Sequence, residues 1–418
     1  ELITCLRTAL GPSWDFQQDG ANLSIRHVSH GGEYQPPRRL ADWSHLLERL
    51  TTGFASCGVE RCRTLPISWK RDTDFTVSAN QALDPYLKDT KPITYSQGFL
   101  PQPAVRFTAK REASGDLLDG FLTSFVNISQ VQPINSIAQH TAILDEWLSV
   151  LSGLGLHARH VTIGGNLRVW QRAELQGITL RIWHAGLEVG DIVLLWNARN
   201  PWFMATDLGS GLERLQWAIS RQDWRTLVFG PYARAHGSGT LDAIRTATLI
   251  VGSGVRPASR GRGSALRRLL RYIPAQQASL GVGAAVRTFH DYWSLVTRPV
   301  TPWQETARIL EGEIAGHSKP TFRTPIQRCA QPPSPRHIVP AQPTSGPRQA
   351  TALAEVESVE VQEAQQQTPL HGKPANEIRF ESDRPYTTAA PCICSPCRCD
   401  VSAVHPGRCG SAVRSPGR

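Results

Sequence analysis

An aspartate and an arginine beside closely spaced glycines are the residues of this sequence best suited to chemistry on a charged ligand. The segment Thr206–Leu215 reads TDLGSGLERL and places Asp207, Gly209, Gly211 and Arg214 within one short stretch. Glycines let a backbone approach a ligand closely, and an arginine in the first turns of a helix can make charge-assisted contacts with phosphate oxygens. By themselves, glycines at this spacing before a helix favour a plain turn, and the alternative is a nucleotide site.

A second segment, Gly254–Arg271, is rich in arginine and suits the phosphates of a nucleic acid. It reads GVRPASRGRGSALRRLLR, in a chain with a formal net charge of +10 and a pI of about 9.4. A basic surplus attracts polyanions such as RNA. The alternative is a solvated basic helix that covers the protein surface.

Cysteines are sparse through most of the chain and crowded near its end. Only Cys5, Cys57 and Cys62 occur in the first 300 residues, whereas four cysteines lie within Cys392–Cys399. Sparse usage is typical of a reducing compartment and not of a disulfide framework. The terminal cluster could ligate zinc, but it has no second ligand pair at finger spacing. We therefore expect no metal site there.

The composition also bears on membranes and location. No stretch reaches the ~20 apolar residues that a membrane span requires. No basic segment followed by a short apolar run suggests a signal peptide. We expect a cytoplasmic protein with no membrane partner.

Apolar spacing predicts a sheet with helices around it, which is an α+β fold class. Helical periodicity covers 40–51, 143–154, 208–219, 259–273 and a stretch past 293 to about 314. Strand patterns occur within 64–82 and at 104–108, 121–128, 160–163, 168–170, 178–183, 191–196 and 203–206. The two at 104–108 and 121–128 flank a polar loop and predict an antiparallel hairpin.

The chain divides into four parts by composition. Residues 1–39 are polar and irregular, and we expect a loose N-terminal extension. Residues 40–236 contain the candidate site, and 237–318 form a small helical domain. Residues 319–418 are rich in proline, glutamine, serine and threonine. Such a segment buries too little apolar surface to offset chain entropy, so we expect a disordered tail.

Three segments resemble class II aminoacyl-tRNA synthetases, and alanyl-tRNA synthetases most closely. The family's motif 3 reads Asp-x-Gly-x-Gly-Leu-Glu-Arg, as residues 207–214 do here. Leu241–Ala247 is similar to the family's Asp-His-Ile-Arg-Ala segment. Gly254–Arg271 is similar to the segment that opens its tRNA-binding helical domain. The resemblance covers somewhat over half the chain and implies the class II antiparallel sheet with flanking helices.

Upstream segments resemble motifs 1 and 2 of the same family. Asp72–Leu83 is similar to the family's Asp-Asp-Pro-Thr-Leu-Leu-Phe-Thr-Asn-Ala-Gly-Met. Phe121–Ser129 is similar to its Phe-Phe-Glu-Met-Leu-Gly-Asn-Phe-Ser. The resemblance then makes Pro66 the motif 1 proline and Arg106 the motif 2 arginine.

The resemblance implies a site for ATP, Mg²⁺ and an amino acid, with the acceptor stem of a tRNA as partner. Its catalytic residues are Arg106, on the α-phosphate, and Arg214, on the γ-phosphate. Phe121 stacks on adenine. The further implied contacts are Gly209 and Gly211 with ATP, Asp207 and Asn127 with the amino acid, and Arg262, Arg267, Arg268 and Arg271 with tRNA.

The implied activity is that of an alanine-tRNA ligase. It activates alanine or a similar small amino acid as an aminoacyl adenylate and transfers it to tRNA. The sequence departs from the family, because the motif 2 glutamate falls on Thr123, the Arg-His-His segment before it is missing and the loop is shorter. The editing and oligomerising domains have no counterpart, so we expect a freestanding core. The alternatives are a non-catalytic paralogue that binds RNA, and an adenylating enzyme that loads a carrier protein or biosynthetic acceptor.

Overall fold

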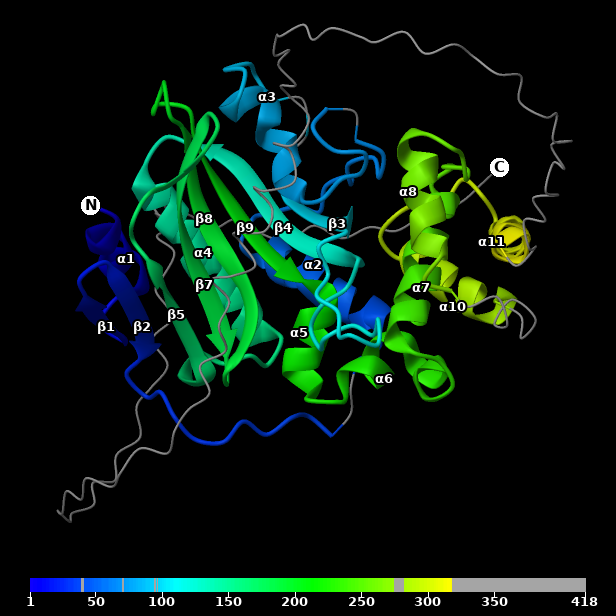
Figure 1. The fold of residues 1–418 in the computed structure, drawn as a ribbon. Coiled ribbons are helices and arrows are strands. Elements are labelled where there is room, and N and C mark those ends of the chain that lie inside the picture. Colours follow the sequence, from blue (N-terminus) through cyan, green and yellow to red (C-terminus); the bar gives the residue numbers. More distant parts are fainter. Residues whose placement is uncertain (39–40, 70, 94, 96, 274–281, 318–418) are drawn as a thin grey trace, which may run out of the picture. The chain divides into compact units, whose positions relative to one another are not determined.

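A large antiparallel sheet forms the centre of the protein (Figure 1). This computed structural model describes residues 1–38, 41–69, 71–93, 95, 97–273 and 282–317. Its sheet and flanking helices confirm the expected α+β class. The expected disorder of 319–418 and the cluster Cys392–Cys399 lie outside the described residues.

Strands that are distant in sequence become neighbours in the sheet. The order is β1-β2-β5-β7-β8-β9-β4-β3, and β6 pairs with β7. Strand β9, which contains Gly209 and Gly211, therefore lies between β8 and β4. The strands are β1 Trp14–Asp19, β2 Asn22–His27, β3 Phe99–Val105, β4 Ser124–Ile134, β5 Val161–Asn166, β6 Trp170–Arg172, β7 Leu175–His184, β8 Leu187–Asn197 and β9 Met204–Gly211.

One face of the sheet carries the main apolar core. Helix α4 (Ile137–Gly153) packs against this face together with α1 (Leu2–Leu10) and α2 (Trp43–Ser56). Trp147 of α4 stacks on Phe54 of α2, with 5.6 Å between ring centroids. Leu208 of β9 lies in the same core. Because side chains alternate along a strand, the neighbours of Leu208 on β9, Asp207 and Gly209, face the opposite side.

The opposite face is apolar at one end and polar toward the other. The 3₁₀ helix η1 (Ala79–Leu83) and helix α3 (Asp84–Leu87) cover a small apolar cluster that includes Val131, Val193 and Ala205. Beyond this cluster, the same face carries the charged and amide side chains of the candidate site. Helices η1 and α3 thus cover the apolar part of this face, and the polar part lies beside it.

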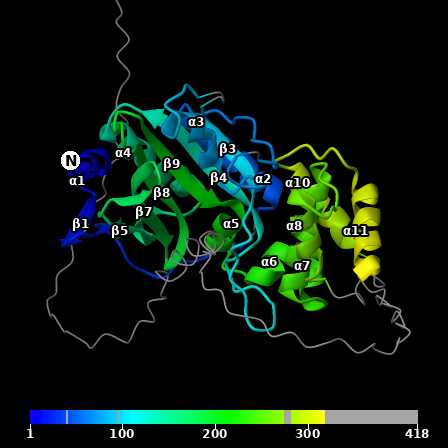
Figure 2. The same cartoon turned by 45° about the horizontal axis from the view of Figure 1, so that its top comes forward.

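Helices α7 (Ser238–Gly252), α8 (Gly261–Leu270), α10 (Gly283–Ser294) and α11 (Trp303–His317) follow β9 in sequence and gather beyond the β3 edge (Figures 1 and 2). All fifteen residues of α7 are buried. Its Arg245 forms a buried ion pair with Glu213 of α5 and lies between the rings of Tyr292 and Trp293. A buried charge must keep its partner, so this pair fixes α7 to the sheet. The helices between β9 and α7 are α5 Leu212–Ser220, α6 Trp224–Phe229 and η3 Gly230–Arg234. The short helix η2, Ala158–His160, lies between α4 and β5.

The expectation of a loose extension at residues 1–39 was wrong for its first part, whereas residues 28–38 contain no helix or strand. Residues 2–27 form α1, β1 and β2, and β2 pairs with β5 of the central sheet. The hairpin turns at Gly20, whose φ of 55° suits glycine. Leu23 and Ile25 of β2 are buried, whereas β1 is largely exposed, which hides its strand character in the sequence.

Two further segments differ from the sequence expectation. Within 64–82, the described residues form a bridge between Ser68 and Phe75 and the helix η1 in place of a strand pair. A capping box between Ser78 and Gln81 starts η1. The segment from Leu208 remains a strand as far as Gly211, because its backbone pairs with both β8 and β4.

None of the helices in the described part of the chain combines the length and apolar composition needed to cross a bilayer.

Candidate functional site

The polar face of β4, β9 and β8 brings together residues from three separate parts of the sequence. Asn127 of β4 lies opposite Gly211 of β9, and Asp191 of β8 lies opposite Gly209. Asp207 stands two residues before Gly209 on the same face. Two carboxylates and one amide therefore surround the glycine on this face.

Asp207 is held in place by neutral donors. Its Oδ2 accepts a hydrogen bond from Nδ2 of Asn80 at 2.9 Å, and the side chain is only 8% exposed. Burial raises the pKa of Asp207 to about 6, although Asn80 and the positive charge of Arg106 act in the opposite direction. An ionised Asp207 therefore lacks full compensation and would be stabilised by a cation.

Asp191 is a site residue that sequence reasoning missed. Burial raises its pKa to about 7, and the nearby charges of Asp207 and Glu188 act in the same direction. Arg106 and Arg181 lower the pKa, but by less. The signal in the sequence is a lone carboxylate directly before the apolar run 192–195, where a charge is costly unless it has a role.

Gly209 keeps the space between these groups open. A Cβ atom at this position would lie 3.3 Å from Oδ1 of Asp191 and 3.5 Å from Nδ2 of Asn127. Asn127 is itself fixed, because its Nδ2 donates to the Ser210 carbonyl and its Oδ1 accepts from the Ala79 amide. The glycine therefore leaves a space between Asp191 and Asn127, on the face that also carries Asp207.

Arg106 follows the last residue of β3, at the border of this face. Its Nε donates to the Val77 carbonyl at 2.7 Å, and its guanidinium lies 5.1 Å from the centre of the Phe125 ring. The electrostatic effect of Arg106 on both Asp207 and Asp191 places its charge near the carboxylates. Arg106 can thus act on an anion bound beside them.

Arg214 lies in the first turn of α5, directly after the glycines. Its Nη2 donates to the Gly120 carbonyl at 2.7 Å and its Nη1 to the Glu188 carbonyl at 3.2 Å. Burial lowers the pKa of Arg214, whereas Glu188 and Asp191 raise it. The two arginines therefore approach the carboxylates from different elements, β3 and α5.

Phe121 and Phe125 occupy different places. Phe121 precedes β4, and the Lys110 ammonium lies 5.3 Å from its ring centre. Phe125 is on β4, two residues before Asn127, and its ring faces Arg106. By strand alternation, Phe125 belongs to the same face as Asn127, so it is a second aromatic candidate for contact with a base.

The four arginines expected to contact tRNA differ in their surroundings. Arg267 makes two hydrogen bonds of 3.1 Å with the Glu313 carboxylate of α11. Arg268 and Arg271 are exposed. Arg262, partly buried, lines a cleft of about 930 Å³ together with residues 68–69, 71–74, 253–255, 260, 261 and 263. The basic segment is thus partly used to join α8 to α11.

Comparison of the chain with protein-family models and with curated proteins finds no match. Within the described residues, no group of three or more His, Cys, Asp or Glu side chains is placed to hold a metal ion. The charges of this face suit a cation beside Asp191 and Asp207 and an anion beside Arg106 and Arg214.

Proposed function

We propose that this protein activates a small amino acid, alanine or one of similar size, with ATP and transfers it to tRNA. The observation that carries the proposal is the cation-attracting pair Asp207 and Asp191 flanked by Arg106 and Arg214 on one sheet face. An α-amino acid next to a triphosphate has the matching charges, an ammonium beside phosphates. The resemblance to class II synthetases supports the same assignment.

The proposed reaction needs positioning and charge neutralisation more than acid–base catalysis. The carboxylate oxygen of the amino acid attacks the α-phosphorus, the bond to the bridging oxygen breaks, and pyrophosphate leaves with the bonding electrons. Asp207 orients the ammonium, with Asn127 beside it. Arg106 stabilises charge on the α-phosphate, and Arg214 stabilises charge on the γ-phosphate.

The backbone and rings near these residues suit ATP. Gly209 and Gly211 carry no side chain that would block a nucleotide on this face, and Phe121 and Phe125 are the available aromatic partners for adenine. Magnesium bound with ATP supplies neutralisation of phosphate charge. With Asp207 on the ammonium, Asp191 is the carboxylate that would hold such an ion, and the other ligands would be phosphate oxygens and water.

The acceptor in this proposal is the end of a tRNA, contacted by α8. Arg268 and Arg271 are exposed and suit phosphate contacts, and Arg262 lines the neighbouring cleft. The ion pair of Arg267 with Glu313 favours a structural role for that residue. The same exposed charges suit an RNA-binding protein without catalysis, which is the second candidate.

Amino-acid-dependent exchange of pyrophosphate into ATP, measured with each proteinogenic amino acid, tests the proposal. We expect exchange with alanine or another small amino acid, and charging of tRNA with the same amino acid. Exchange without charging would indicate a carrier protein or biosynthetic acceptor. Absence of exchange with every amino acid, together with salt-dependent RNA binding, would favour the non-catalytic alternative.

A further inference from the structure

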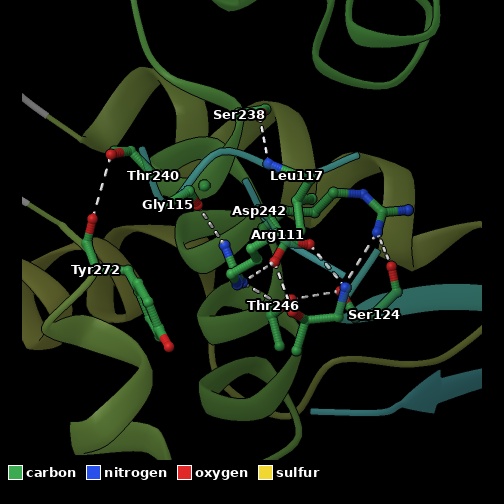
Figure 3. A network of polar contacts seen from close by, with 12 residues as sticks. Arg111, Gly115, Leu117, Ser124, Ser238, Thr240, Asp242, Thr246 and Tyr272 are labelled. Carbon is green, nitrogen blue, oxygen red and sulfur yellow. Dashed lines mark hydrogen bonds and ion pairs between the residues drawn. The ribbon is translucent and has the colours of Figure 1, made fainter. Parts of the chain in front are cut away.

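A single buried carboxylate ties the segment between β3 and β4 to helix α7. Asp242 of α7 is fully buried and accepts hydrogen bonds from the Thr123 amide at 2.9 Å and from the Thr123 hydroxyl at 2.6 Å. Nη2 of Arg111 donates to the same carboxylate at 3.0 Å. Figure 3 shows Arg111 and Asp242 turned toward each other.

Arg111 also fixes the middle of the segment. Its Nη1 donates to the Gly115 carbonyl at 3.1 Å, and its guanidinium lies 4.5 Å from the centre of the Tyr272 ring. A Cβ atom at Gly239 of α7 would lie 2.3 Å from the Gly115 carbonyl oxygen. The segment and the helix therefore approach closely, and Arg111 fills the contact.

A second set of bonds supports the same contact. The Leu117 amide donates to the Ser238 hydroxyl at 2.9 Å (Figure 3). The Asp116 carboxylate accepts from the Ser238 hydroxyl and from the Gly239 amide. The first turn of α7 thus holds the segment at several points, but only Asp242 is a fully buried charge among them.

Two backbone carbonyls near the end of this segment accept hydrogen bonds from the two arginines of the candidate phosphate site. The Arg106 amide donates to the Thr123 carbonyl at 2.7 Å. The Gly120 carbonyl, three residues before Thr123, accepts from Nη2 of Arg214 at 2.7 Å. A shift of Thr123 would therefore move the partners of both arginines, although Asp242 lies in α7 and bonds to neither of them.

We propose that Asp242, through Thr123 and Arg111, is a positioning residue for the phosphate-binding arginines. The inference rests on the proposed function of the site. It also accounts for Thr123, which stands where the resembled family has a glutamate. In this protein the Thr123 hydroxyl bonds to Asp242, so the carboxylate at this contact belongs to α7. The helical part of the chain thereby controls the geometry of the nucleotide site.

Thr123→Val is the sharpest test, because valine keeps the shape and the backbone amide and removes only the hydroxyl. Asp242→Asn removes the charge that holds Arg111. Glu112→Gln is the matched control, since Glu112 is exposed in the same segment and the change likewise converts a carboxylate to an amide. Amide hydrogen exchange of 107–123 and the KM values for ATP and for the amino acid are measured in all three variants and in the wild type.

We expect amides in 107–123 to exchange at least tenfold faster in Thr123→Val and Asp242→Asn, with amides of β8 and β9 unchanged. The KM for ATP should rise about tenfold or more, whereas the KM for the amino acid should stay within about threefold. Glu112→Gln should match the wild type in both measurements.

The inference is overturned if amides of 107–123 exchange as slowly in Thr123→Val as in the wild type. It is also overturned if both KM values rise equally and amide exchange accelerates throughout the sheet, which is the pattern of a merely structural residue. If the wild type lacks pyrophosphate exchange, the proposed function fails. Calorimetric affinity for ATP then replaces KM, and unchanged affinity in Thr123→Val, or no binding by the wild type, overturns the positioning role as well.

Discussion

At the residue scale, the buried carboxylates of the polar face carry an electrostatic cost that the fold does not offset. The pKa of Asp191 is raised to about 7 and that of Asp207 to about 6, in both cases chiefly by burial. For a carboxyl with a raised folded-state pKa, the folded protein binds the proton more tightly than the unfolded chain. Stability is therefore lost as pH rises from about 4 through the raised pKa, and the loss levels off above it.

Asp191→Asn should stabilise the protein at neutral and alkaline pH, because it removes the charge that burial disfavours. We expect a gain on the order of 2 kcal/mol above pH 7, a rise in melting temperature of a few degrees, and a smaller gain as pH falls toward 4. Thermal melting between pH 4 and pH 8 measures this. Asp19→Asn, a change at an exposed position on β1, is the control, and an equal effect from it would contradict the account.

Asp207→Asn should weaken amino acid binding far more than ATP binding. A carboxylate offers the ammonium a charge-assisted bond, and an amide offers only a neutral one. The expected loss is roughly tenfold or more in amino acid affinity, with ATP affinity within about threefold. Calorimetric titration of each ligand separates the two. Equal losses for both ligands would argue against the ammonium contact.

Residue types and spacing offered Asp207, Gly209, Arg106 and Arg214 as candidates, because each lies in or beside a segment that resembles a family motif, and the structure brings them to one part of the sheet. They did not identify Asp191, which adjoins Gly209 only through the pairing of β8 with β9. Nor did they predict the bond of Arg267 to Glu313, 46 residues further along the chain. Contacts of that kind depend on the tertiary packing of separate elements.

At the element scale, β9 combines two functions in one strand. Its Leu208 side anchors the strand in the core, and its glycine side faces the proposed ligand site. Most strands were foreseeable from apolar alternation between 104 and 206. The β1–β2 hairpin was not, since β1 exposes nearly all its side chains and gains its place from β2, which pairs with β5.

Gly209→Ala should impair amino acid binding while leaving the fold intact. The added methyl would meet Asp191 and Asn127 at ordinary to slightly tight distances, so the strand should tolerate it, but it fills the space that the glycine leaves between them. We expect the KM for the amino acid to rise about tenfold and the melting temperature to change little. Gly153→Ala at the end of α4 is the control, because an added Cβ there would meet no neighbouring side chain or strand within 4 Å. Wild-type kinetics for Gly209→Ala would show that the ligand lies elsewhere.

At the scale of the whole molecule, the helices after β9 carry the basic segment 254–271 beside the sheet (Figure 1). They are joined to it by the buried pair of Arg245 with Glu213 and by the contacts of Asp242. Composition predicted the basic character of 254–271 but not which arginines are free for a partner. The packing of α8 on α11 decides that, because it pairs Arg267 and leaves Arg268 and Arg271 exposed.

Replacing Arg268 and Arg271 together with alanine should weaken tRNA binding and flatten its dependence on salt, because each lost phosphate contact reduces the slope by about 1. Pyrophosphate exchange should stay near the wild-type rate. Filter binding across a range of salt concentrations measures the slope. Arg168→Ala, which removes an exposed charge after β5, is the comparison, and an identical slope in all three proteins would exclude α8 as the RNA contact.

The central claim is that Arg106 and Arg214 hold the phosphates of ATP on the face that carries Asp207. Amino-acid-dependent pyrophosphate exchange in Arg106→Ala and Arg214→Ala tests it most directly, with Arg168→Ala as the control. We predict a loss on the order of a hundredfold or more in each of the two variants, because each removes a charge contact to the reacting triphosphate, and wild-type exchange in the control. Exchange at the wild-type rate in both Arg106→Ala and Arg214→Ala would contradict the account.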